Sequence, residues 1–244
     1  MSSLSGKVAI VTGSSRGIGR AIAERLGHDG ANVVVTYAGN QGKAEEVVAA
    51  IEANGAKAIA LQVNMRNLSD VRDLFQITLS RFDKLDILVN NAAGVNVFKP
   101  TAEMTEDEYN SMFDITRGVY FALQQAAYHI ADSGRIINIS TSGTAMAIPA
   151  GGAYAASKAA IEHFSFALAK ELGARGITVN TISPGVTETD GLVLDPEQVK
   201  QMIAQTPLGR LGHPNDVASA VAMLVSDDAR WITGQSLRAN GGIV

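Results

Sequence analysis

A tyrosine and a lysine four positions apart, in the stretch AYAASKAA, form a pair of side chains that could hold and move a proton. Positions i and i+4 lie on one face of a helix, so Tyr154 and Lys158 would project in the same direction. A nearby ammonium group favours the phenolate and lowers the phenol pKa from its usual value of about 10. The neighbouring side chains are small, which leaves room for a substrate beside the ring. Such pairs are common in ordinary helices, so the meaning of this one depends on the residues around it.

Hydroxyl side chains end the apolar run that precedes this pair. The segment RIINISTSG carries Ser140, Thr141 and Ser142 at the end of an expected strand. A hydroxyl there could share a carbonyl oxygen with the phenol and orient the substrate for hydride attack. Side chains alternate between the two faces of a strand, so Thr141 and Ser142 should point in opposite directions and only one should face the site. Both are candidates.

A glycine-rich stretch, TGSSRGIG at residues 12–19, follows the first expected strand and opens a helix. A helix N-terminus offers unpaired N–H groups and partial positive charge to a pyrophosphate, and glycine allows the backbone to approach it. The spacing is G-x-x-x-G-x-G, which differs from the more general G-x-G-x-x-G of dinucleotide sites. The residues of this loop expected to bind the cofactor are Gly13, Ser15, Arg16, Gly17, Ile18 and Gly19.

The end of the second expected strand predicts which nicotinamide cofactor binds. NAD selection commonly uses a carboxylate roughly 20 residues after the glycine loop. Here the segment VVVTYAGNQGK offers Tyr37 and Asn40 as contacts and has no carboxylate before Glu45. The missing negative charge removes repulsion of a 2′-phosphate, which Arg16 could reach. We therefore expect NADP(H) to be preferred, with NAD(H) possible.

Short apolar runs alternate with segments of helical periodicity along most of the chain. Runs that are apolar throughout are typical of strands buried on both faces, and strand–helix–strand order favours parallel pairing. We expect a Rossmann-type α/β fold, a doubly wound parallel sheet of about seven strands with helices on both faces, as a single domain over residues 1–244. The expected strands lie near 8–11, 33–35, 58–63, 87–89, 136–139, 179–182 and 236–238, and the expected helices near 18–26, 44–53, 68–82, 106–130, 155–172 and 215–225.

One long stretch, residues 184 to about 207, shows no clear periodicity. Connections of this length in compact domains are commonly functional, so we expect an irregular substrate lid over about 186–207. Its apolar residues suit an acyl-like ligand, although apolar residues also occur in a lid simply because it folds over a core. These residues are Leu192, Val193, Leu194, Met202 and Ile203.

Composition argues against several other classes of protein. The net charge is −4 and Lys and Arg do not cluster, which disfavours a nucleic-acid or anionic-membrane surface. The chain has no cysteine, so disulfides, thiolate nucleophiles and Cys-based metal sites are excluded. No metal site is expected, because the four histidines, His28, His129, His163 and His213, are scattered. No signal-peptide pattern and no apolar run of about 20 residues is found, so we expect a cytoplasmic protein.

Six motifs occur together and in order: TGSSRGIG, VNNAAG, IINIS, YAASK, SPGVTET and the C-terminal GRLGHPNDVASAVAMLVSDDARWITGQSLRANGG. With them the chain resembles the short-chain dehydrogenase/reductase (SDR) family essentially end to end. Within that family it is most similar to the 3-oxoacyl-[acyl-carrier-protein] reductases and related NADP-dependent carbonyl reductases.

The resemblance implies roles for particular residues. Tyr154 would be the general acid/base, and Lys158 would lower its pKa and hold the nicotinamide ribose. The resemblance also implies a homotetramer built on the long fourth and fifth helices and the C-terminal segment. The further residues that it places at the cofactor are Asn64, Met65, Asn91, Ala92, Ala93, Pro184, Gly185, Val186 and Thr189.

The sequence departs from the family pattern in three places. The helper hydroxyl of the family lies thirteen residues before the tyrosine, so spacing favours Thr141 while residue type favours Ser142. The segment FDITRG lacks the asparagine that helps to bind a relay water in the family, and that position is Ile115 or Thr116 depending on the end from which it is counted. VNNAAG has one alanine more than the usual NNAG. We therefore expect a slower or differently routed proton relay, in which Thr116 would hold the water.

The function expected from these residues is NADPH-dependent reduction of a ketone to a secondary alcohol by hydride transfer, with the tyrosine as general acid. The ketone would be 3-oxoacyl-like or another small carbonyl compound. It could be bound to an acyl carrier, for which Arg117 is a candidate docking residue. Two alternatives are an NADP-binding protein of this fold with weak or no turnover and a regulatory or binding role, and an NAD(P)-dependent alcohol or sugar dehydrogenase. The sequence does not distinguish the physiological substrate or the direction of the reaction.

Overall fold

Seven apolar runs form one parallel sheet in the computed structural model, which describes residues 4–192 and 195–244. Every neighbouring pair of strands is parallel, and the order across the sheet is β3-β2-β1-β4-β5-β6-β7. The strands are β1 (Val8–Val11), β2 (Asn32–Tyr37), β3 (Ala58–Gln62), β4 (Leu85–Asn90), β5 (Ile130–Ile139), β6 (Thr178–Pro184) and β7 (Ser236–Ala239). The predicted doubly wound fold is confirmed.

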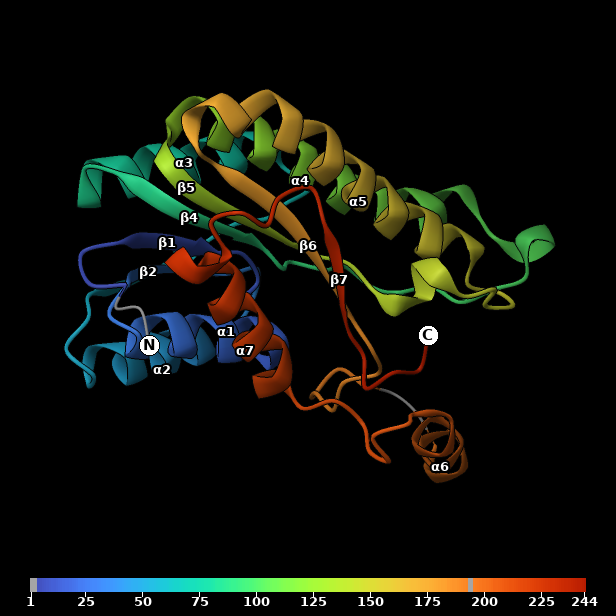
Figure 1. Cartoon of the computed structure of the whole chain (residues 1–244). Helices are drawn as coiled ribbons and strands as arrows, with labels where there is room; N and C mark the ends of the chain where they lie inside the picture. Colours follow the sequence, from blue (N-terminus) through green and yellow to red (C-terminus); the bar gives the residue numbers. More distant parts are fainter. Residues whose placement is uncertain (1–3, 193–194) are drawn as a thin grey trace.

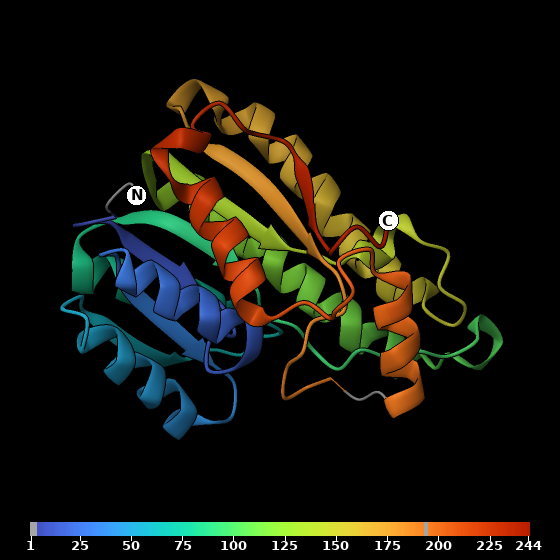
Figure 2. The ribbon, with the colours of Figure 1, turned by 60° about the horizontal axis from the view of Figure 1, so that its bottom comes forward.

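Helices cover both faces of this sheet (Figure 1). On one face lie α1 (Gly17–His28), α2 (Gln41–Glu52) and α7 (Pro214–Val225), and on the other lie α3 (Leu68–Phe82), α4 (Glu106–His129) and α5 (Gly152–Leu172). Figure 2 shows α1 and α7 side by side, although nearly the whole chain separates them in sequence. This arrangement of three layers follows from strands that are apolar on both faces.

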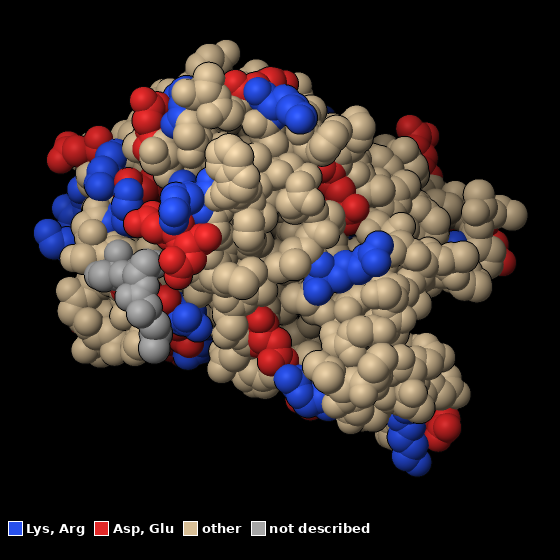
Figure 3. Space-filling model, in the orientation of Figure 1, with Lys and Arg blue, Asp and Glu red and all other residues tan. Residues whose placement is uncertain are grey.

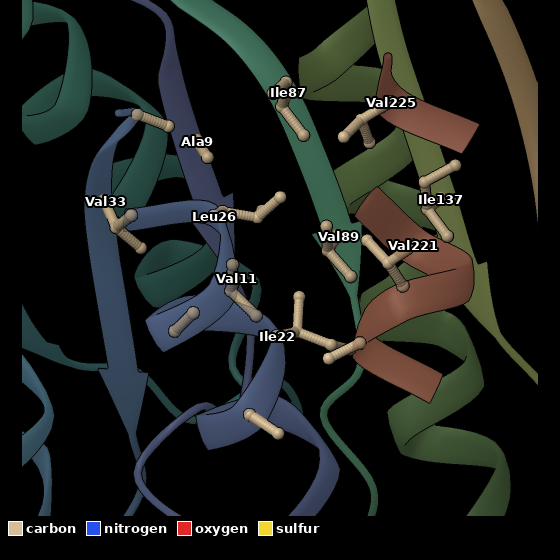
Figure 4. Packing of buried hydrophobic residues seen from close by; sticks show 14 of the residues in the cluster. Ala9, Val11, Ile22, Leu26, Val33, Ile87, Val89, Ile137, Val221 and Val225 are labelled. Atoms are coloured by element: carbon tan, nitrogen blue, oxygen red, sulfur yellow. The ribbon is translucent and has the colours of Figure 1, made fainter. Parts of the chain in front are cut away.

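The core consists of aliphatic side chains that interlock between the sheet and the helices. Figure 4 shows Ile22 of α1 and Val221 of α7 between the central strands and the helix layer, with Val11, Val89 and Ile137 pointing toward them. All five side chains are fully or almost fully buried. Each such side chain contributes about 1.5–3 kcal/mol when it leaves water. The sheet is therefore a rigid base for the loops at its carboxyl edge.

The strand order reverses between the adjacent strands β1 and β4. The chain continues from β1 to β2 and β3 in one direction across the sheet, and from β4 to β5, β6 and β7 in the other direction. At such a switch point the loops after the two strands separate and leave a crevice at the carboxyl edge, where ligands bind in this class of fold. The loop after β1 contains the glycine-rich stretch, and the loop after β4 contains VNNAAG. The fold therefore brings together two of the predicted cofactor segments.

A chain of buried polar groups fixes α5 to the sheet. Asn90 Nδ2 donates to Asn138 Oδ1 at 2.8 Å, and Asn138 Nδ2 donates to Ser165 Oγ of α5 at 2.7 Å. Thr181 Oγ1 of β6 also donates to Ser165 Oγ, at 2.9 Å. Buried polar groups are costly without partners, so these bonds permit few other positions of the helix. They hold α5, which carries Tyr154, in one rotation against this face of the sheet.

The stretch expected to be irregular contains a helix, α6 (Pro196–Gln205), so that expectation is wrong for these residues. Asp195 Oδ1 accepts from the Gln198 N–H at 2.8 Å, and Gln198 Oε1 accepts from the Asp195 N–H at 3.0 Å. This reciprocal capping, with Pro196 in the first turn, starts a helix that has no fully buried residue. In Figure 1, α6 stands apart from the two helix layers.

Two of the predicted lid residues, Val193 and Leu194, lie outside the described residues. No helix in the described part of the chain is long and apolar enough to span a bilayer. On the face drawn in Figure 3, basic and acidic side chains are intermixed over the helices, and no broad region carries a single sign of charge.

Candidate active site at the carboxyl edge of the sheet

The glycine-rich loop forms a cradle that side chains would fill. Gly13 has φ +62°, and a Cβ there would lie 2.8 Å from the Cα of Ala92. A Cβ at Gly19 would lie 2.4 Å from Asn91 Nδ2. Glycine is thus required both for the backbone conformation and for the close approach of the loops after β1 and β4. The open backbone at the N-terminus of α1 fits the diphosphate of a dinucleotide.

Asn91 acts within the protein rather than pointing freely into the crevice. Its Nδ2 donates to the carbonyl oxygens of Thr12 and Gly13, each at 3.0 Å. Thr12 Oγ1 in turn accepts from the N–H groups of Asn91 and Ala92, at 2.9 and 3.0 Å. The predicted cofactor contacts Asn91 and Ala92 therefore lie beside the cradle, and the Asn91 amide holds its shape. Ala93 is exposed next to them.

The other residues of the cradle differ in exposure. Arg16 is exposed at the N-cap of α1, while Ser15 and Ile18 are half-buried and Ile18 packs against the core. A Cβ at Gly17 would lie 3.5 Å from Thr189 Cγ2. The start of the predicted lid, at Thr189, thus reaches the glycine loop.

A cavity of about 520 Å³ opens at the ends of β2 and β3 and against α3. Asn64 lines it, and Asn64 Oδ1 accepts from the Arg66 N–H at 3.1 Å; its contact with an adenine stays a prediction. Met65 is buried and belongs to the core, so its side chain does not line the cavity. Asn40 Oδ1 caps α2 by accepting from the Lys43 N–H at 3.0 Å, and Tyr37 is half-buried against the core.

A cation that the sequence reading missed lies near the end of β2. Lys43 Nζ is 3.1 Å from Asp190 Oδ2 of the lid segment. The hydrogen bond from Lys43 lowers the pKa of Asp190, and the charges of Arg16 and Arg20 lower that pKa further. Three cations therefore act on one exposed carboxylate beyond the end of β2. Lys43 is the first basic residue after β2, which is the signal that could have identified it.

Thr141, and not Ser142, faces the phenol of Tyr154. The Thr141 side chain is hydrogen-bonded to the Tyr154 side chain, which lowers the pKa of the phenol. Ser142 is buried, and its Oγ donates to the Ser183 carbonyl oxygen at 3.1 Å. The two neighbouring hydroxyls thus point in opposite directions, as strand alternation predicts. The ring of Phe98 lies against the Tyr154 ring, with 5.1 Å between their centroids and a tilt of 48°.

Burial opposes ionisation of both members of the tyrosine–lysine pair. Burial raises the pKa of Tyr154 above its ordinary value, despite the hydrogen bond from Thr141. Burial also lowers the pKa of Lys158 to about 8. Lys158 Nζ donates to the Ile139 carbonyl oxygen at 3.4 Å. Burial is thus the largest influence on both pKa values, and the lowering of the phenol pKa by Lys158 stays a prediction.

Thr116 is placed differently from the expectation that it holds a relay water. It is buried, and its Oγ1 donates to the Ser157 carbonyl oxygen of α5 at 3.1 Å. This hydrogen bond therefore joins α4 to α5, and the hydroxyl proton is used within the chain. Arg117 forms an ion pair with Asp114 at 3.1 Å and donates to the Arg66 carbonyl oxygen at 3.3 Å, so it already has partners within the chain.

The loop after β6 completes the edge of the crevice. Pro184 ends β6, and the Gly185 N–H donates to the Ala239 carbonyl oxygen at 3.2 Å. The Val186 carbonyl oxygen accepts from the Gly212 N–H at 2.9 Å. These bonds fix the backbone that the resemblance places at the nicotinamide. In the described part of the chain, no three His, Asp or Glu side chains are grouped in a way that could hold a metal ion.

Comparison with known proteins agrees with this geometry. A family model described as enoyl-(acyl carrier protein) reductase matches residues 13–244. An uncharacterised oxidoreductase of Methylorubrum extorquens is 46% identical, with 100% of both chains covered. The 3-oxoacyl-[acyl-carrier-protein] reductase FabG of Staphylococcus aureus is 41% identical, with 97% of this chain and 98% of that protein covered.

A solved structure shows the same similarity in three dimensions. The angucycline C-6 ketoreductase LanV, determined with bound NADP, superposes with a TM-score of 0.93 at 40% identity over 98% of this chain and 96% of that chain. The fold and the glycine cradle define the class: this is an NAD(P)-dependent oxidoreductase built on a Rossmann-type sheet. More specifically, the chain belongs to the short-chain dehydrogenase/reductase family.

The lowered pKa of Lys158 predicts that the site reduces the stability of the fold. A group whose pKa is about 8 when folded and about 10.5 when free binds more protons in the unfolded state between these values. The destabilisation is therefore complete below pH 8 and disappears as the pH approaches 10.5. We expect Lys158→Met to raise the free energy of unfolding by ~1–3 kcal/mol at pH 7, and by much less at pH 10, in urea denaturation.

The matched control is Lys170→Met, at an exposed position on the same helix. It should change the free energy of unfolding by less than about 0.5 kcal/mol at either pH. A stability gain for Lys158→Met that is as large at pH 10 as at pH 7 would show that burial of the charge is not its cause.

Proposed function

We propose that the chain reduces a ketone to a secondary alcohol with NADPH, and that the Tyr154 phenol delivers the proton to the carbonyl oxygen. One observation supports the proposal: the phenol, the Thr141 hydroxyl and the Lys158 side chain meet at the carboxyl end of β5, which only β4 separates from β1 and its glycine loop. Bound NADPH would supply the hydride. The similarity to FabG and to an angucycline ketoreductase supports a 3-oxoacyl-like or other small ketone as the substrate.

Each of these residues has a separate task in the proposed reaction. Thr141 and Tyr154 both offer O–H groups to the carbonyl oxygen, and that orients the carbonyl carbon toward the hydride donor. Tyr154 transfers its proton as negative charge develops on the oxygen. Lys158 remains mostly protonated at pH 7, because its pKa is about 8, and its charge stabilises the phenolate that remains.

Apolar groups around the phenol support an uncharged substrate. Phe98 is 52% exposed even though its ring contacts the Tyr154 ring. Met202 and Ile203 are half-buried on α6 of the lid segment. A flat or acyl-like ketone could cover these exposed apolar surfaces when it binds. Arg117 is already paired with Asp114 and with the Arg66 carbonyl oxygen, so a carrier-bound substrate that docks on Arg117 is the less favoured form.

The cation cluster predicts a preference for NADPH over NADH. In fluorescence titrations we expect NADPH to bind at least about 10-fold more tightly, because Lys43 and Arg16 would pair with the 2′-phosphate. Lys43→Met should weaken NADPH binding by about 10-fold and leave NADH binding unchanged. The control is Lys57→Met, which removes an exposed lysine at the amino end of β3, away from the carboxyl ends where the cofactor would bind. It should leave the binding of both cofactors unchanged. Tighter binding of NADH than of NADPH to the unmodified chain would refute the preference.

If Tyr154 transfers the proton, the variant Tyr154→Phe should lose turnover but keep its affinity for NADPH. The variant should bind NADPH with unchanged affinity and lose about 10²–10⁴-fold in turnover, which is the usual contribution of general acid catalysis. Oxidation of NADPH would be followed at 340 nm with a panel of β-ketoesters, diketones and aromatic ketones. Tyr128→Phe, at an exposed tyrosine of α4, is the control.

A second candidate function is NADP binding with little or no turnover. The observation that favours it is Thr116, whose hydroxyl bonds to the Ser157 carbonyl oxygen where the family commonly has the asparagine of a water relay. The same assay separates the two functions. Tight NADPH binding without oxidation by any ketone of the panel would support the second function and reject the first.

We propose further that the chain forms a homotetramer through α4 and α5. These helices lie side by side and present large aromatic side chains to solvent, including Tyr120, Tyr128 and Phe166. Exposed apolar surface of this kind commonly marks a protein interface. Sedimentation velocity at micromolar concentration should show a species of four chains, and Phe166→Glu should shift it toward smaller species. A single monomer peak for the unmodified chain would exclude this assembly.

A further inference from the structure

One carboxylate oxygen behind the site accepts hydrogen bonds from three hydroxyl groups. Glu162 lies on α5, one helical turn after Lys158. Its Oε1 accepts from Ser140 Oγ at 2.6 Å, from Thr144 Oγ1 at 2.8 Å and from Ser183 Oγ at 3.2 Å. None of the predicted roles uses this residue.

The three donors come from three different segments around the phenol. Ser140 follows β5, Thr144 lies in the 3-10 helix η2 (Ser142–Ala145), and Ser183 lies at the end of β6. Glu162 therefore ties α5 to two strand ends and to the turn that follows Thr141. Hydrogen bonds to an ionised acceptor are roughly twice as strong as bonds between neutral groups, which makes this carboxylate the strongest acceptor available to the hydroxyls.

The connection to the phenol runs through Thr144 and the backbone of Thr141. Thr144 Oγ1 lies 3.0 Å from the Thr141 carbonyl oxygen and 2.8 Å from Glu162 Oε1, and its single proton is shared between these two acceptors. Thr141 Oγ1 also accepts from the Gly143 N–H at 3.2 Å. The turn is thus held from both sides, and its conformation sets the direction in which the Thr141 hydroxyl points. That hydroxyl is the one bonded to Tyr154.

We propose that Glu162 is a positioning residue, which fixes the turn after β5 so that the Thr141 hydroxyl stays bonded to the Tyr154 phenol. The proposal rests on the proposed function. Glu162 itself does not contact the phenol or the reacting atoms. Without its carboxylate Thr144 and Ser140 lose their short bonds to α5, so the turn is free to shift relative to that helix, and the Thr141–Tyr154 hydrogen bond forms in a smaller fraction of molecules.

A double-mutant cycle tests this role. Glu162→Ala should lower kcat by about 10-fold while the Kd for NADPH changes by less than about twofold. In the Thr141→Ala background the same substitution should lower kcat by less than about twofold, because the bond that Glu162 supports is already gone. Glu162→Gln keeps one carbonyl acceptor and should recover part of the lost activity. Glu171→Ala, at an exposed position of the same helix, is the control.

The pH profile of the reverse reaction supplies a readout that loss of stability alone would not move. The Thr141 bond lowers the phenol pKa, so weakening it should shift the acidic limb of alcohol oxidation to higher pH in Glu162→Ala. If Glu162→Ala does not fold, Thr144→Val removes only the link to the turn and should still lower kcat by about 3-fold. Equal losses from Glu162→Ala in both backgrounds, with an unshifted pH profile, would overturn the proposal.

The outcomes also separate this proposal from the proposed function. If Tyr154→Phe and Thr141→Ala both leave turnover unchanged, the proposed reaction is wrong and the role of Glu162 falls with it. If both of those variants lose turnover while Glu162→Ala and Thr144→Val keep it, the reaction stands and only the positioning role is rejected.

Discussion

The rotation of α5 about its own axis is the constraint on which the candidate site depends. Tyr154, Lys158 and Glu162 follow each other at four-residue intervals on this helix, so a single rotation directs all three. That rotation is set by buried polar contacts, chiefly the bond from Asn138 to Ser165. Apolar packing alone would tolerate small shifts of the helix, whereas a buried hydrogen bond is lost when its partners separate. These hydrogen bonds thus join α5 to the rigid sheet and thereby fix the direction in which the Tyr154 phenol points.

Burial at the site has opposite effects on stability and on the proposed chemistry. It raises the pKa of Tyr154 and lowers the pKa of Lys158, so each charged form is disfavoured in the chain alone. The same low polarity strengthens any attraction between an ammonium group and negative charge that develops beside it. The pair is therefore poised to respond to a bound substrate, at some cost to the stability of the fold.

The sequence predicted those features that depend on neighbouring residues. The helix at Leu68–Phe82 was located correctly, because the apolar periodicity and the residues at its ends all lie within that segment of the sequence. The capping signal at Asp195 is equally local, and the absence of a clear period hid it. The alternation of side chains along a strand predicted that Thr141 and Ser142 point in opposite directions. Which of the two meets the Tyr154 phenol depends on the side of β5 on which α5 packs, and the sequence does not give that position. The contacts of Glu162 join segments roughly 20 residues distant on either side, and no local pattern reports them.

Two of the departures from the family pattern lie next to each other in the structure. The extra alanine of VNNAAG precedes Gly94, and a Cβ at Gly94 would lie 3.1 Å from Ile115 Cγ1, at the point where α4 lacks the expected asparagine. The loop with the extra alanine thus packs against α4 at Ile115, and the glycine allows the close contact. Thr116, next in sequence, joins α4 to α5 through the Ser157 carbonyl oxygen. Since Ser157 lies between Tyr154 and Lys158 in the same helix, the altered packing bears directly on the site that it borders, and the two changes are best understood as one local rearrangement.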